Sequence, residues 1–246
     1  MAEFSMHLND DQIQIKDWIH QFAVEHIRPH AQEWDDREEF PWPIVQEASK
    51  IGLYGFEFLM NAMADPSGLT MPVAIEEIFW GDAGIGMAIM GSGLAAAGIS
   101  GNGTPEQMIE WVPQCYGTPD DIKLGAFCVS EPDAGSDVSS LRTRAVYDEA
   151  KDEWVINGHK WFISGANRAN FAILLCRTED NPDLPQAANT AFIIDLPSEG
   201  WNEVREIETM HGGTGHSEIL IEDLRVHKDQ MLGGRGQGHL LGQFRL

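Results

Sequence analysis

GAFCVSEPDAGSD at residues 125–137 and WVINGHKWFISGA at residues 154–166 each contain an apolar run that ends at a serine. The first run has the character of a buried strand and ends at Ser130. Pro132 then breaks it and sends the chain into a Gly/Ser/Asp loop. We therefore expect Ser130 and nearby backbone N–H groups to face a ligand.

The second run is also an apolar strand that ends at a serine. Asn157-Gly158 predicts a tight hairpin turn, and the strand that follows carries Trp161 and Phe162 before it ends at Ser164. The two rings could lie along a ring system while the hydroxyl bonds its polar edge. Each run alone is equally compatible with an ordinary sheet element, but the two in this order favour a buried flavin.

The motifs in order resemble the acyl-CoA dehydrogenase family of flavoproteins. Its middle domain has a strand (Y/F)-x-(V/M)-(T/S)-E-P-x-A-G-S-D followed by K-x-(W/F)-I-(T/S). Here FCVSEPDAGSD occupies residues 127–137 and KWFIS occupies residues 160–164. Further matches in family order are FPWPIVQEASKIGLYG, GTPEQMIEWVP, GHSEILIEDLRV and MLGGRGQG, so the resemblance covers almost the whole chain.

The resemblance implies FAD as cofactor and assigns residues to its site. Ser130 and Ser164 would bond the flavin ring near N5 and its carbonyl edge, and Ser136 matches a position that touches the acyl-CoA substrate. The expected cofactor-binding residues are Phe127, Cys128, Val129, Ser130, Gly135, Ser136, Phe162, Ile163 and Ser164. Departures from the family pattern are Ser130 for the commoner threonine, Gly165 for asparagine, and Asp133 for glycine, which affects the expected substrate preference rather than flavin binding.

The implied reaction is α,β-dehydrogenation of an acyl-CoA thioester to a trans-2-enoyl-CoA, as in fatty acid β-oxidation. In the family the base is a glutamate of a C-terminal helical domain, which we do not find in this chain, so no catalytic residue is assigned. The implied partners are acyl-CoA, an electron-transfer flavoprotein or similar acceptor, and further copies of the chain in a homo-oligomer. Alternatives are a flavin-dependent monooxygenase or acyl-CoA oxidase of the same fold, and a non-catalytic module that binds flavin or acyl-CoA.

Composition limits the partners. The 246 residues carry a formal net charge of −23, which argues against nucleic acid or an anionic membrane surface. Residues 51–122 contain no Lys or Arg, so cations for a polyanion such as coenzyme A must come from elsewhere. The candidates are Arg142, Arg144, Lys160 and Arg168.

Three cysteines without CxxC spacing indicate reduced thiols, and no targeting segment is evident, so we expect a soluble cytoplasmic protein. The uncharged stretch at residues 83–105 is rich in glycine, which suits a protein-buried helix better than an integral membrane segment. Its small residues fit either tight helix packing or room for an acyl chain.

Periodicity changes at residue 123. Before it, helices are expected from Asn9 onward, from about residue 43 to Gly52, over residues 70–80 and after the Thr104 cap. After it, short strands are expected at residues 124–130, 142–148, 153–157, 160–164, 171–177, 190–196 and 217–226. We predict an α+β multidomain fold: an all-α domain at 1–122, an antiparallel β-barrel or sandwich at 123–228, and at 229–246 the start of a truncated C-terminal helical domain.

Other groups are given structural interpretations. His26 and His30 are four apart, but Pro29 and the lack of a third ligand argue against a metal site, and no metal is assigned. His211 and His216 flank a predicted turn and are assigned a surface or interface role. Pro182 and Pro185 indicate an exposed loop. Glu131 and Asp137 are expected to brace the motif loop rather than act as general acid and base.

Overall fold

The computed structural model describes residues 7–179, 188–209 and 215–243. The chain forms two compact units, residues 1–90 with 118–122 and residues 91–117 with 123–246. Residues 91–117 therefore pack in the same unit as the strands. These units are defined by contacts within the chain and do not test the predicted domain boundaries at 122/123 and 228/229, which stay predictions. The predicted loop prolines at 182 and 185, and His211, lie outside the described residues.

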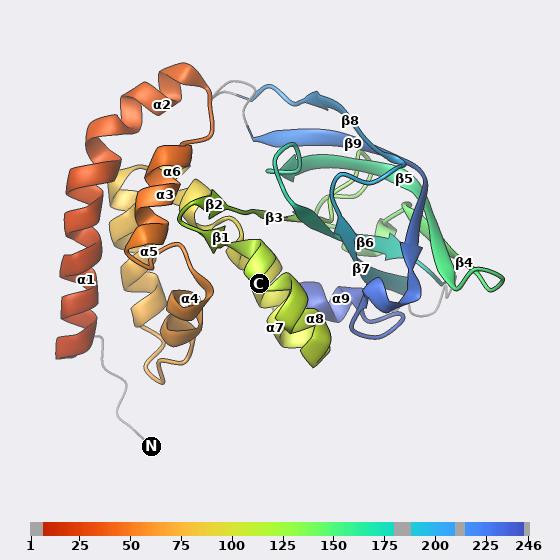
Figure 1. The fold of residues 1–246 in the computed structure, drawn as a ribbon, viewed down its shortest axis with the longest axis horizontal. Helices are drawn as coiled ribbons and strands as arrows, with labels where there is room; N and C mark the ends of the chain where they lie inside the picture. Colours follow the sequence, from red (N-terminus) through yellow and green to blue (C-terminus); the bar gives the residue numbers. More distant parts are fainter. Residues whose placement is uncertain (1–6, 180–187, 210–214, 244–246) are drawn as a thin grey trace. The chain divides into compact units, whose positions relative to one another are not determined.

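The first unit is helical (Figure 1). Its helices are α1 (Asp10–Phe22), α2 (Ala31–Arg37), α3 (Trp42–Lys50), α4 (Phe56–Met63), α5 (Thr70–Gly81) and α6 (Ala83–Met90). The expected cap of α1 is confirmed, because Asn9 and Gln12 form a reciprocal capping box. The expected helices that became α3 and α5 are also confirmed; α2 and α4 were not predicted.

The glycine-rich stretch forms helix α6 and, after a turn at Gly91-Ser92, helix α7 (Gly93–Asn102). By length and composition alone Ala83–Asn102 could cross a membrane, but 44% of its most apolar window is buried in the protein. A Cβ on Gly86 would lie 2.8 Å from the Phe79 ring, and one on Gly81 would lie 2.7 Å from Ile27. At these two positions the structure favours the tight-packing explanation for glycine.

The second unit contains α7, α8 (Pro105–Trp111), α9 (Gly238–Gln243) and the main sheet. The Thr104 cap of α8 is confirmed as a capping box with Gln107. The Gln107 amide also donates to the carbonyls of Asp229 and Met231, which ties α8 to the chain ahead of α9. The sheet strands are β3 (Gly125–Cys128), β4 (Arg144–Asp148), β5 (Glu153–Ser164), β6 (Phe171–Arg177), β7 (Asn189–Asp195), β8 (Trp201–Glu206), β9 (His216–His227) and β10 (Met231–Leu232). The short strands β1 (Gly117–Thr118) and β2 (Asp121–Ile122) form a separate two-stranded sheet.

The predicted helical domain followed by a β domain is confirmed, but within the described residues the sheet does not close into a barrel. Its strand order is β10-β7-β6-β4-β5-β9-β8, and β3 pairs with β6 off this path. Most pairs are antiparallel, but β3 and β4 each run parallel to β6. The apolar core of the sheet includes Trp154, Ile156 and Phe192, together with the buried thiols Cys128 and Cys176. Burial raises the pKa of each of these two thiols to about 12.

The predicted Asn157-Gly158 turn is wrong. Both residues lie inside the twelve-residue strand β5, which pairs with β4 on one side and β9 on the other. The glycine is needed for a different reason: a Cβ there would lie 2.6 Å from the Cα of Thr143. A two-residue turn signal was overridden by strand pairing on both sides and by this close backbone approach.

We expect Gly158→Ala to destabilise the second unit by about 1–3 kcal/mol, because the added methyl group has no room beside Thr143. Urea unfolding would show a lower midpoint. Gly93→Ala is the matched control, since a Cβ there meets nothing within 4 Å. Equal midpoints for the two variants would contradict the close-packing explanation.

Candidate functional site

The two serine-ended motifs meet in the structure. The backbone N–H of Trp161 donates to the carbonyl of Ser130 at 2.9 Å. The Lys160 ammonium donates to the carbonyl of Val129 at 2.9 Å. The chain just beyond β3 is therefore held against the C-terminal part of β5, so the two motifs lie side by side.

A buried ion pair joins the motifs. Lys160 Nζ lies 2.8 Å from Glu131 Oε1, and the two side chains are 0% and 4% exposed. Glu131 also accepts the backbone N–H groups of Arg142 (2.6 Å) and Thr143 (3.0 Å). Burial alone would raise the pKa of Glu131, but the Lys160 charge and these hydrogen bonds outweigh it and hold the pKa below its usual range. The expectation that Glu131 braces the motif loop fits these contacts, and Lys160 is committed to this pair.

Residues 131–136 form a tight loop after β3. Glu131 and Ala134 exchange backbone hydrogen bonds at 2.9 and 3.2 Å. Gly135 and Ser136, which follow, are exposed, and a Cβ on Gly135 would meet no atom within 4 Å. The loop thus presents the backbone of Gly135 and the hydroxyl of Ser136 to open space.

A bulge in β5 shapes the second motif. The β5/β9 register shifts between Lys160 and Ile163, and Phe162 has a φ of 56°, in the left-handed region. Such a conformation is strained for a bulky residue and persists only where the surroundings hold it, often at functional sites. As a result the Phe162 ring is 50% exposed while Ile163 is buried. Ser164, at the end of the strand, is exposed.

The Ser164 hydroxyl has a partner that the sequence did not reveal. Its Oγ lies 3.0 Å from Nδ1 of His216, the residue directly opposite Ser164 in the β5/β9 pair. The Phe162 and His216 rings are 6.2 Å apart at 66°. The surface role expected for His216 thus becomes a specific contact with a candidate site residue. The sequence did not show this contact, because it depends on the register in which residues 160–164 of β5 pair with residues 216–219 of β9.

The predicted site residues divide by accessibility. Phe127, Val129 and Ser130 are half-buried, so only part of each residue is accessible to a ligand. Cys128 and Ile163 are buried in the core and could contribute only backbone groups. The exposed members are Gly135, Ser136, Phe162 and Ser164.

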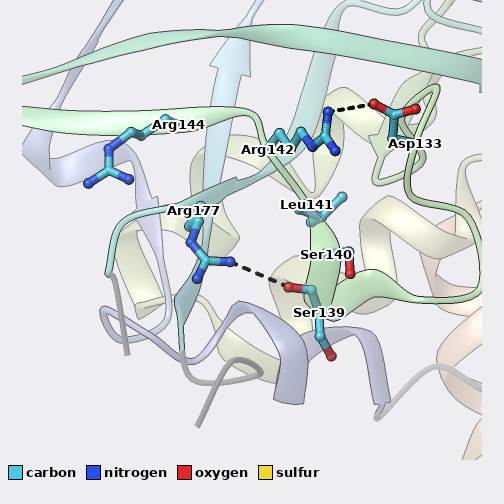
Figure 2. A pocket seen from close by; sticks show the side chains of 7 residues that line it. All are labelled: Asp133, Ser139, Ser140, Leu141, Arg142, Arg144 and Arg177. Atoms are coloured by element: carbon cyan, nitrogen blue, oxygen red, sulfur yellow. Dashed lines mark hydrogen bonds and ion pairs between the residues drawn. The ribbon is translucent and has the colours of Figure 1, made fainter. Parts of the chain in front are cut away.

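Two of the predicted cation candidates line an open hollow of about 690 Å³, shown in Figure 2. Arg142 and Arg144 lie there with Arg177, which was not predicted. Arg144 of β4 is paired with Arg177 of β6, and the Arg177 guanidinium donates to the carbonyl of Ser139 at 3.5 Å. Arg142 pairs with Asp133 at 2.7 Å, and Asp133 belongs to the same loop as Ser136. The other two candidates differ: Lys160 is buried, and burial lowers the pKa of Arg168, opposed by Glu206 and Glu203.

The described residues contain no group of three or more His, Cys, Asp or Glu side chains placed to hold a metal ion. His30 Nδ1 lies 3.2 Å from the carbonyl oxygen of His26, a local helix contact. Asp137 bonds Ser140, as expected for a residue that braces the loop.

Two family models match this chain. The family model "Acyl-CoA dehydrogenase, N-terminal domain" matches residues 9–117, and "Acyl-CoA dehydrogenase, middle domain" matches residues 126–224. The chain is 30% identical over 240 residues to a probable medium-chain specific acyl-CoA dehydrogenase 2, mitochondrial, of Caenorhabditis briggsae, covering 96% of this chain and 57% of that protein.

Two solved structures are similar. Butyryl-CoA dehydrogenase from Megasphaera elsdenii superposes with a TM-score of 0.83 at 26% identity, over 98% of this chain and 63% of that one. A structure described as an electron transferring flavoprotein of Acidaminococcus fermentans gives 0.80 at 26% identity, over 97% of this chain and 62% of that one. This chain therefore spans about 60% of the length of these relatives.

We expect Lys160→Met to destabilise the second unit by about 3–5 kcal/mol, because it leaves the Glu131 carboxylate buried without its cation. Lys151→Met, at an exposed position, is the control and should change the unfolding free energy by less than about 0.5 kcal/mol. Urea unfolding at neutral pH measures both. Equal midpoints would show that the pair contributes no stability.

The pH dependence has a defined sign. Because folding lowers the pKa of Glu131, its contribution is fully present above the unfolded pKa of about 4.3 and is lost as pH falls through the lower folded value. In Lys160→Met this acid-side loss should shrink or reverse. Unfolding midpoints measured from about pH 3 to about pH 6 would show it, and parallel curves for the two proteins would contradict it.

Proposed function

Because this chain belongs to the acyl-CoA dehydrogenase family, we propose that it carries the FAD and thioester site of an FAD-dependent acyl-CoA dehydrogenase. The single observation that supports this most is the meeting of the two motifs, with Trp161 N–H bonded to the Ser130 carbonyl. The substrate class is a saturated acyl-CoA, and the product is a trans-2-enoyl-CoA. An electron-transfer flavoprotein as acceptor, a homo-oligomer, a role in β-oxidation and a cytoplasmic location belong to the same proposal.

The residues present fit an isoalloxazine ring. The site offers two hydroxyls, Ser130 and Ser164, beside an exposed aromatic ring, Phe162. Cβ atoms added at Gly135 or Gly165 would meet nothing within 4 Å, so open space borders both motifs. This donor set matches a flat group with an apolar face and polar edges.

When bound, FAD supplies an acceptor for the hydride that leaves the carbon β to the thioester carbonyl. The chain's own residues would hold the ring. The hydroxyls of Ser130 and Ser164 would bond its polar edge, and the buried Lys160–Glu131 pair keeps the two motifs in place. Preorganised donors of this kind stabilise charge without reorganisation during the reaction. No residue of this chain is assigned as the base that removes the α proton.

The hollow lined by Arg142, Arg144 and Arg177 is our proposed location for phosphate groups of the ligands. It concentrates positive charge in a chain whose formal net charge is −23. Guanidinium groups bind phosphate oxygens in bidentate geometry.

The test is to add FAD to the purified 246-residue chain, remove the excess, record the visible spectrum and then add saturated acyl-CoAs without oxygen. Retained yellow colour is the expected result, and bleaching by an acyl-CoA would show that the chain also supplies the base. Colour without bleaching would favour the binding module, and hydrogen peroxide formed in air would favour the oxidase. A chain that retains no flavin would contradict the proposal.

We expect Ser130→Ala to weaken FAD binding about three- to tenfold, the effect of losing one hydrogen bond to the ring. Ser198→Ala is the control, because the Ser198 hydroxyl bonds the Asp195 carbonyl in a turn outside the candidate site. Equilibrium titration of the flavin absorbance measures both dissociation constants. Equal affinities in the two variants would remove Ser130 from the site.

A further inference from the structure

The contact between Ser164 and His216 links a candidate flavin ligand to a titratable group. The two residues face each other at the end of the β5/β9 pair, with Oγ 3.0 Å from Nδ1. Two backbone bonds hold this corner: Gly165 N–H donates to Gly215, and Ile207 N–H donates to His216. The relative position of the hydroxyl and the imidazole is therefore set by the sheet.

The single proton of the Ser164 hydroxyl can point to His216 or to a ligand, but not to both. A serine hydroxyl has one proton and two lone pairs, whereas an imidazole nitrogen is a donor or an acceptor according to protonation. If Nδ1 accepts, the only proton of Ser164 points to His216, and Oγ has only lone pairs left for a ligand. If Nδ1 carries a proton, it donates to Oγ, and the hydroxyl can then donate to a ligand.

The charged groups around His216 already have other partners. Glu218, two residues along β9, lies 2.8 Å from both His159 and Arg205. On β8, Glu206 accepts from Asn167 and Glu203 accepts from Ser217. Arg168 is influenced by Glu206 and Glu203. Within the described part of the chain no ion pair engages His216, and its ring contacts the Ser164 hydroxyl and the Phe162 ring.

We propose that His216 is a positioning residue that sets the direction of the Ser164 hydrogen bond. Neutral His216 carries its proton on Nε2 and accepts the Ser164 proton through Nδ1. Protonated His216 donates from Nδ1 and frees the hydroxyl to donate to an acceptor on the oxidised flavin ring. This inference rests on the proposed function, because it takes Ser164 as a ligand of FAD.

The expected effect is tighter binding of oxidised FAD at lower pH. An imidazole changes charge between about pH 5 and pH 8, and one gained hydrogen bond corresponds to about a three- to tenfold change in affinity. The positive charge itself would also attract the FAD phosphates. The two causes separate in Ser164→Ala, which keeps the charge and removes the hydroxyl.

The experiment is FAD titration of the full 246-residue chain at about pH 6 and about pH 8. We expect about threefold or tighter binding at the lower pH in the wild type, and no such change in Ser164→Ala or His216→Gln. His159→Gln is the matched control, because it removes a histidine of β5 that pairs with Glu218. It should keep the wild-type dependence. A pH-independent wild type, or a wild-type ratio retained in Ser164→Ala or His216→Gln, would overturn the inference while leaving FAD binding intact.

Nitrogen NMR of the ligand-free chain provides the second readout. An unprotonated, hydrogen-bonded Nδ1 in neutral His216, with a signal that moves in Ser164→Ala, is the expected result. A neutral His216 with the proton on Nδ1 would overturn the inference without FAD. Absence of FAD binding at either pH would instead contradict the proposed function and, with it, the role given to His216.

Discussion

The candidate site depends on one interaction, the buried ion pair of Lys160 and Glu131. Moving two charges out of water is costly, and the cost is repaid only when each remaining hydrogen-bonding group also finds a partner. Here the ammonium also bonds the Val129 carbonyl, and the carboxylate also accepts two backbone N–H groups. The pair is therefore a cross-link between two strands and the start of β4, so a change at either residue would move both serine-bearing motifs.

The consequences of this cross-link appear on the exposed side of the same strands. With Lys160 pointing inward, the bulge that follows turns the Phe162 ring outward and returns Ile163 to the core. The strained backbone at Phe162 lies within two residues of both Lys160 and Ser164. A rigid, fully bonded interior thus supports an open surface with two hydroxyls and an aromatic ring, which is the arrangement that a flat cofactor requires.

The charges of the second unit also differ between its interior and its surface. Inside, Lys160 is neutralised by Glu131. Outside, Arg142, Arg144 and Arg177 gather around one hollow, and His216 lies beside Ser164 with no acidic partner among the residues that the structure describes. Sequence alone grouped Lys160 with the arginines as candidates for a polyanion. Burial removes it from that set, because an ammonium held by a carboxylate and a carbonyl cannot also meet a phosphate.

Local sequence determined the parts of this protein whose energetics are local. Capping boxes at Asn9 and Thr104 specify the starts of α1 and α8 through hydrogen bonds between residues three apart. The apolar run that ends at Ser164 specifies where β5 stops, whereas β3 ends at Cys128, two residues before Ser130. The motif order was enough to indicate the family. Tertiary structure decided the rest, because it depends on pairing between distant segments. Asn157-Gly158 continues a strand since β4 and β9 flank it, the sheet stays open, and His216 reaches Ser164 only through the β5/β9 register.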